Sequence, residues 1–124
     1  MTPRRPGPAR RDRYALLEMR ELLGSIIDVR DDGGRDRYFA DDRHRWVLHR
    51  LWIAVGNEAV AYSAAGEAER HRDEPWNTLR RLRNHLAHRR LPDIDEDFVW
   101  RTSQLRPESL IAQVEQLLGA PEPF

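Results

Sequence analysis

Residues 76–92 read WNTLRRLRNHLAHRRLP, and this stretch decides the fold because it combines a helical apolar pattern with a clear end. Its large apolar residues recur at intervals of three and four: Trp76, Leu79, Leu82 and Leu86. That spacing is typical of the buried face of an α-helix. Pro92 disfavours helical geometry in the residue before it, so the helix must end by that point. The stretch predicts an amphipathic helix that starts near Pro75 and directs its leucines toward a core.

The same apolar period continues on both sides of this stretch. It predicts further helices over residues 12–30, 42–65, 95–104 and 107–119. Asp12 is a candidate N-cap for the first of these, and Asp41 or Asp42 for the second. Gly56, in the middle of the long second helix, favours close packing against a neighbouring helix. Residues 31–42, DDGGRDRYFADD, are expected to form a turn, because two adjacent glycines are costly inside a helix.

Together these elements predict an all-α fold, an up-and-down bundle of four to five helices. No segment alternates apolar and polar residues for long enough to form a strand. The helical domain is expected to span residues 12–119, between a disordered tail at 1–11 and a short C-terminal tail at 120–124. No window approaches the roughly 20 apolar residues of a membrane span. We therefore expect a soluble, cytoplasmic protein with no membrane partner.

The composition limits the kinds of site the chain can carry. All 21 basic residues are arginine, and 21 acidic residues balance them, so the formal net charge is zero. A neutral chain argues against a broad nucleic-acid-binding surface, so any site for a polyanion must be local. The lack of cysteine excludes disulfides and thiolate metal sites.

One such local site is indicated by residues 81–90, which contain four arginines and two histidines. Asn84 and His88 are four residues apart and share a helix face, with Arg83 beside them. Arginine binds phosphate with two hydrogen bonds, and histidine exchanges protons near neutral pH. RNA carries its own nucleophile, the 2′-hydroxyl, so this trio requires no metal and no cofactor. The competing interpretation is an ordinary solvated helix face.

The segment LRRLRNHLAHRRLPDIDEDFVWRT, residues 79–102, closely resembles the signature of the HepT-like branch of HEPN ribonuclease toxins. The Arg-Asn-x-x-x-His motif of that family is matched at Arg83, Asn84 and His88. The family's Asp/Ile-rich turn and Val-Trp helix are matched by DIDEDFVW, and its Pro-Trp entry by EPW. YFADD and VGNEA are similar to two further family segments, so the likeness covers roughly residues 14–118.

The resemblance implies a metal-independent RNA endonuclease toxin of a type II-like or type VII-like toxin–antitoxin system. It implies a homodimer whose Arg and His side chains form one composite site, with Arg83 on the scissile phosphate, His88 in proton transfer and Asn84 in positioning. It also implies a minimal nucleotidyltransferase antitoxin that adenylylates a tyrosine two residues after the motif histidine. This chain has Arg90 there, which puts adenylylation at that position in doubt.

Neighbouring residues allow further interpretations. Arg80, Arg89 and Arg90 are candidate RNA-binding residues, as is Arg81, and all can equally be solvated or paired with acids. His85 and His88 have a spacing that can bind a metal, although no third ligand is evident. The acidic run over residues 93–97 favours capping of the next helix over Mg²⁺ binding. Trp76 and Trp100 can stack on bases but fit a core better.

Two other functions remain open from the sequence. One is a non-catalytic HEPN-type subunit that holds nucleotide or RNA in a nucleotidyltransferase complex. The other is a purely structural helical dimer.

Overall fold

The computed structural model describes residues 6–65 and 74–119. These residues form six α-helices and one 3-10 turn: α1 (Pro6–Asp31), α2 (Gly34–Ala40), α3 (Asp42–Ala65), α4 (Trp76–His88), η2 (Leu91–Asp93), α5 (Glu96–Leu105) and α6 (Pro107–Leu118). The prediction of an all-α helical bundle is confirmed. None of the described helices is long and apolar enough to cross a membrane.

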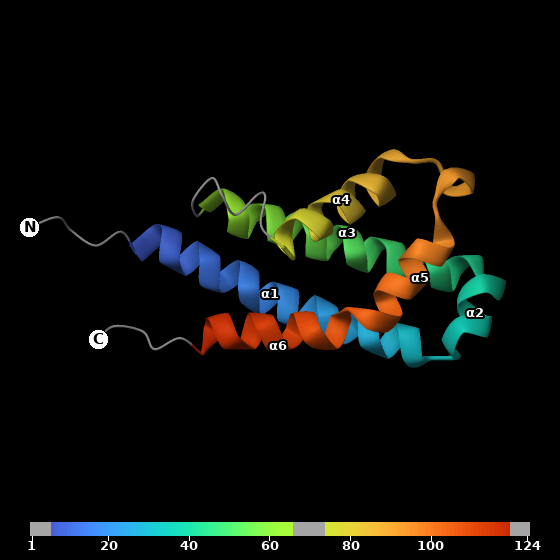
Figure 1. The fold of residues 1–124 in the computed structure, drawn as a ribbon, viewed down its shortest axis with the longest axis horizontal. Coiled ribbons are helices and arrows are strands. Elements are labelled where there is room, and N and C mark those ends of the chain that lie inside the picture. Colours follow the sequence, from blue (N-terminus) through green and yellow to red (C-terminus); the bar gives the residue numbers. More distant parts are fainter. Residues whose placement is uncertain (1–5, 66–73, 120–124) are drawn as a thin grey trace, which may run out of the picture.

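The longer helices α1, α3, α4 and α6 run alternately in opposite directions (Figure 1), as expected for an up-and-down bundle. α3 packs against both α1 and α4, and α6 packs against α1. The short helices α2 and α5 lie toward the end of the bundle where α1 ends and α3 begins (Figure 1). The chain therefore leaves α4 at this end and returns through α5 into α6.

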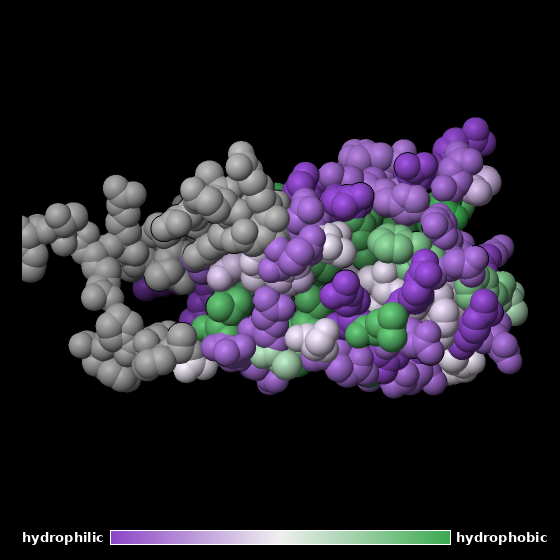
Figure 2. Space-filling view, viewed as in Figure 1, coloured by the Kyte–Doolittle hydropathy of each residue, from purple (hydrophilic) through white to green (hydrophobic). Residues whose placement is uncertain are grey.

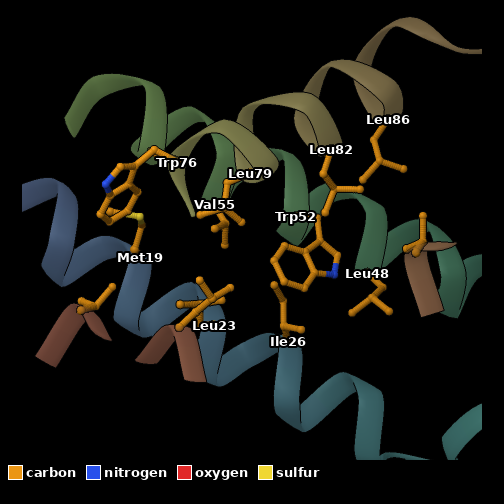
Figure 3. Packing of buried hydrophobic residues seen from close by; sticks show 14 of the residues in the cluster. Met19, Leu23, Ile26, Leu48, Trp52, Val55, Trp76, Leu79, Leu82 and Leu86 are labelled. Atoms are coloured by element: carbon orange, nitrogen blue, oxygen red, sulfur yellow. The ribbon is translucent and has the colours of Figure 1, made fainter. Parts of the chain in front are cut away.

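The core lies between α1, α3 and α4, with contributions from α5 and α6. Figure 3 shows its central side chains pointing into the space between the three helices: Met19, Leu23, Ile26, Leu48, Trp52, Val55, Trp76, Leu79, Leu82 and Leu86. Trp52 is fully buried, and its indole Nε1 donates a hydrogen bond to Ser103 Oγ at 2.8 Å. Trp76 and Trp100 are also buried, which favours the core interpretation over base stacking.

Residues 31–42 were expected to be a turn, and this prediction is wrong in part. Gly33 and Gly34 have φ values of 87° and 63°, which reverse the chain after α1 in a conformation that favours glycine. A seven-residue helix, α2, then follows directly. Tyr38 of α2 is fully buried. Tertiary contacts of this residue therefore stabilise a helix that the local sequence does not predict.

A polar cluster that we call the Glu96 network surrounds Tyr38. The Tyr38 hydroxyl donates to Glu96 Oε1 at 2.5 Å, and His49 Nε2 donates to the same oxygen at 2.7 Å. Arg45 Nε lies 3.5 Å from Glu96 Oε2. Burial raises the pKa of the Tyr38 hydroxyl, and its hydrogen bond to Glu96 raises that pKa further. The network joins α2, α3 and the first turn of α5.

The helix ends follow the predicted caps except at the N-terminus. Asp41 Oδ1 accepts from the backbone N–H groups of Arg43 and His44, and Asp95 Oδ1 accepts from that of Phe98. The first helix, however, begins at Pro6 and not at Asp12. Prolines are tolerated in a first helical turn, where the backbone N–H has no partner in any case. Residues 6–11 of the expected tail are therefore helical, whereas 1–5 and 120–124 lie outside the described residues.

Candidate functional site

Three faces of α4 have different surroundings, and they define the candidate site. The first face carries the buried leucines. The second carries Arg81, Asn84, His85 and His88, whose spacing of three, four and seven residues makes one continuous stripe. The third carries Arg80 and Arg83. The predicted trio is therefore divided, because Asn84 and His88 share a face that Arg83 does not.

The stripe opens on a pocket of about 740 Å³. Its described lining consists of Thr78, Arg81, Leu82, Asn84, His85, His88, Arg89, Phe98 and Arg106. α4 forms one wall, Phe98 of α5 contributes an aromatic side chain, and Arg106 comes from the corner between α5 and α6. The pocket thus collects residues from three parts of the chain around the C-terminal half of α4.

The described residues that line this pocket carry fixed charge of one sign only. Three arginines lie among its described lining residues, and no carboxylate does. None of Arg81, Arg89 and Arg106 forms an ion pair within 4.0 Å with another described residue. Figure 2 shows largely hydrophilic residues over the end of α4 and the turn toward α5. A local cationic surface of this kind is suited to an anionic ligand, even though the whole chain is neutral.

Arg83 lies on the face of α4 next to the pocket stripe, and two side-chain hydrogen bonds fix its guanidinium. Its Nε donates to Asn57 Oδ1 of α3 at 2.7 Å, and its Nη1 donates to Asn84 Oδ1 at 2.9 Å. Both acceptors are neutral amides, so the guanidinium is positioned without a carboxylate that would offset its charge. Asn84 accepts from Arg83 and also lines the pocket, so it joins the two faces.

Gly56 makes this arrangement possible. A Cβ atom at Gly56 would lie 2.2 Å from Arg83 Cβ, 2.9 Å from Arg83 Cγ and 3.0 Å from the Leu79 carbonyl oxygen. The absence of a side chain therefore lets α4 approach α3 at Arg83. This contact confirms the predicted close packing at Gly56.

The two histidines of the motif helix have different roles. His85 is partly buried, and its Nε2 accepts a hydrogen bond from the backbone N–H of Asp95 at 3.1 Å. Burial lowers the pKa of His85, and the charge of Arg89 lowers it further, which agrees with an unprotonated acceptor nitrogen. His88 is exposed at the last residue of α4. His85 is therefore engaged within the fold, whereas His88 is open to a ligand.

The structure brings together some of the predicted RNA-binding residues but not others. Arg81 and Arg89 line the pocket. Arg80 does not, because its Nη2 donates to Asn77 Oδ1 at 2.7 Å within α4. Arg90 is exposed but is also absent from the described lining. Within the part of the chain that the structure describes, no group of three or more His, Cys, Asp or Glu side chains is arranged to hold a metal ion.

Four residues of the site were not predicted as such from the sequence: Asn57, Thr78, Phe98 and Arg106. Thr78 lies one turn before Arg81, so the stripe opposite the leucines carries a signal for it. Asn57, Phe98 and Arg106 belong to other helices or corners, and only the packing of those elements brings them to α4. The sequence of α4 contains no information on their approach.

Comparison with known proteins gives no assignment, since the chain matches no protein-family model, no curated protein and no solved structure.

Proposed function

We propose that this chain is a metal-independent endoribonuclease of the HepT-like kind, the cytoplasmic toxin of a toxin–antitoxin pair. The observation that carries the proposal is the pocket at the end of α4, where an exposed histidine lies among arginines and the described lining has no carboxylate. Such a lining suits a phosphodiester, and His88 supplies proton transfer beside it.

The residues of the motif divide the chemistry between them. His88 accepts the proton of the RNA 2′-hydroxyl, and the 2′-oxygen attacks the adjacent phosphorus. The bond from phosphorus to the 5′-oxygen breaks, and the leaving 5′-oxygen takes a proton from solvent water. Arg83 offsets the charge that builds on the phosphate. Asn84 lines the pocket and accepts a hydrogen bond from Arg83, so it holds the guanidinium in a fixed position relative to the pocket. The products are a 2′,3′-cyclic phosphate and a 5′-hydroxyl.

A homodimer brings together the side chains of Arg83 and His88, which a single chain holds apart. Arg83 and His88 are five residues apart, so they project about 140° apart around α4. Two copies of α4 facing each other place the Arg83 of one beside the His88 of its partner, which makes a composite site. Trp46 and Val47 of α3 are 51% and 40% exposed, and a partner subunit gives these large apolar side chains a place to be buried.

Purified protein should cleave RNA in the presence of EDTA, because the proposed reaction uses no metal ion. To test this, total RNA is incubated with tag-free protein and EDTA, and the chemical groups at the fragment ends are analysed. Fragments ending in 2′,3′-cyclic phosphate support the proposal. RNA that stays intact at micromolar protein, with and without Mg²⁺, rules out the nuclease.

A minimal nucleotidyltransferase is the proposed antitoxin, and it should inhibit by binding and not by transferring AMP beside His88. Arg90 has no hydroxyl, and of the three tyrosines Tyr38 and Tyr62 are buried whereas Tyr14 is exposed on α1. Intact-mass spectrometry of the co-expressed pair should show the unmodified chain, with inhibition lost in high salt as the charged surfaces separate. An AMP adduct mapped near His88 contradicts this mechanism.

The second candidate is a non-catalytic subunit that binds nucleotide or RNA in the same pocket. It is favoured by the hydrogen bonds of Arg83, which engage Nε and Nη1 within the fold. A guanidinium held in this way binds an anion with fewer free donors. RNA binding without cleavage would establish this function in place of the first.

A further inference from the structure

We propose that the pocket beside α4 holds one unpaired nucleobase stacked on Phe98, so that the ligand class of this protein is single-stranded RNA. The inference rests on the proposed function in taking RNA as the ligand, but it does not require cleavage. It assigns Phe98 as a specificity-determining residue and assigns the flanking arginines to the phosphates.

Phe98 is the aromatic surface available to such a base. It is partly buried against the core and lines the pocket at the same time. His85 contacts it with ring centroids 6.4 Å apart at 85°, so these two rings are not stacked. No other described aromatic ring pairs with Phe98. The side chain is therefore anchored by the core, and no described ring stacks parallel to it.

The rest of the pocket matches the polar parts of a nucleotide. Leu82 adds apolar lining, whereas Arg81, Arg89 and Arg106 are cations without ion pairs to described residues. Asn84 uses its Oδ1 as acceptor for Arg83, so its NH₂ group is left as a donor for a ribose hydroxyl or a base carbonyl. A volume of about 740 Å³ is within the usual range of small-ligand pockets and accommodates one nucleotide.

Stacking on Phe98 requires a base that is not already paired. In an A-form duplex each base is stacked on both sides, and the deep major groove does not admit side chains. Extruding a paired base costs free energy that a single strand does not lose. Phosphate contacts, in contrast, are available in both forms. The pocket should therefore discriminate single strand from duplex through Phe98 and not through its arginines.

Binding by the His88→Ala protein, in which cleavage should be too slow to interfere, tests the inference. Fluorescence anisotropy is measured with a labelled 12-nucleotide single strand and with the duplex of the same sequence. The single strand should bind at least tenfold more tightly. Phe98→Leu should weaken single-strand binding by about tenfold, or ~1.4 kcal/mol, and leave duplex binding unchanged. Phe98→Trp, which keeps an aromatic face, should retain the preference.

Phe39→Leu is the matched control. Phe39 is also partly buried against the core, but it lies on α2 beside Arg35 and outside the pocket. Its replacement should change neither affinity. Equal binding of single strand and duplex by the parent protein, or equal weakening of both by Phe98→Leu, overturns the inference.

A second measurement needs no substitution at Phe98. A single strand with 2-aminopurine at one position should lose fluorescence on binding, because stacking quenches this base, and unchanged fluorescence at every position along the strand contradicts the inference. The two proposals fail separately. If wild-type protein quenches 2-aminopurine fluorescence on binding but does not cleave RNA, the nuclease proposal is wrong and the assignment of the pocket to a nucleobase stands. If it cleaves single strand and duplex equally, the nuclease proposal stands and the assignment of the pocket is wrong.

Discussion

Arg83→Ala and His88→Ala should each lower RNA cleavage by about 10²- to 10⁴-fold, the usual cost of losing a positioned acid, base or charge. The fold should survive both changes. His88 is exposed at the last residue of α4, and Arg83 lies outside the hydrophobic core. Alanine at position 83 keeps the Cβ that faces Gly56 and loses only the hydrogen bonds to Asn57 and Asn84. Initial rates and thermal unfolding of the same samples give the two quantities. Unchanged cleavage by either variant, at unchanged stability, eliminates the assignment.

Mixing the two inactive variants separates a composite site from one within a single chain. Subunit exchange between Arg83→Ala and His88→Ala forms heterodimers, each with one site that keeps both native side chains. Part of the activity should therefore return, and light scattering should give a mass well above the 14.6 kDa of one chain. Arg90→Ala is the matched control, since Arg90 is exposed nearby but does not line the pocket. No recovery on mixing, or a persistent monomer, excludes the composite site.

Gly56→Ala should lower the free energy of unfolding by about 1–3 kcal/mol, the typical cost of overpacking. The added methyl would lie 2.2 Å from Arg83 Cβ, so α3 and α4 must separate. The shift moves Arg83 away from Asn57 of α3, and cleavage should fall with stability. Denaturant unfolding and initial rates measure both effects.

Gly24→Ala is the internal comparison for this prediction. Gly24 lies within α1, and a Cβ there meets nothing within 4 Å. Alanine is a better helix former than glycine by about 1 kcal/mol, so this variant should be as stable as wild type or more so. If Gly56→Ala is also neutral or stabilising, the close approach of α4 at this point does not hold the helices together.

Much of the fold was accessible from the sequence, because the helices are amphipathic and their caps are local. Asp41 and Asp95 cap α3 and α5 through backbone groups two or three residues away. α2 was missed for the opposite reason. Its burial depends on Tyr38 reaching His49 and Glu96, which are 11 and 58 residues away in the chain. Two glycines indicate a reversal, but they do not show that a helix follows it.

For the site, the sequence predicts only how residues within one helix lie relative to each other. Asn84 and His88 were placed correctly on one face, since four residues of helix fix that relation. Arg80 and Arg81 were both candidates for RNA binding, and only Arg81 lines the pocket. Which polar face meets the pocket depends on how α4 is rotated against its neighbours. Arg106 enters from the corner between α5 and α6, and no periodicity within α4 reports it.

The connection from Arg89 to Asp95 is short, and its far end is tied back to α4 and to the core side of α5. His85 accepts from the Asp95 backbone N–H, and Glu96 is joined to Tyr38 and His49 in the Glu96 network. The conformational entropy of this segment is therefore lost on folding and not on binding. Arg89 is presented to a ligand by a backbone that has little left to order, so a larger part of its attraction to phosphate should appear as affinity. In calorimetric terms, binding at this pocket should carry a smaller unfavourable entropy than binding by a flexible arginine-rich arm.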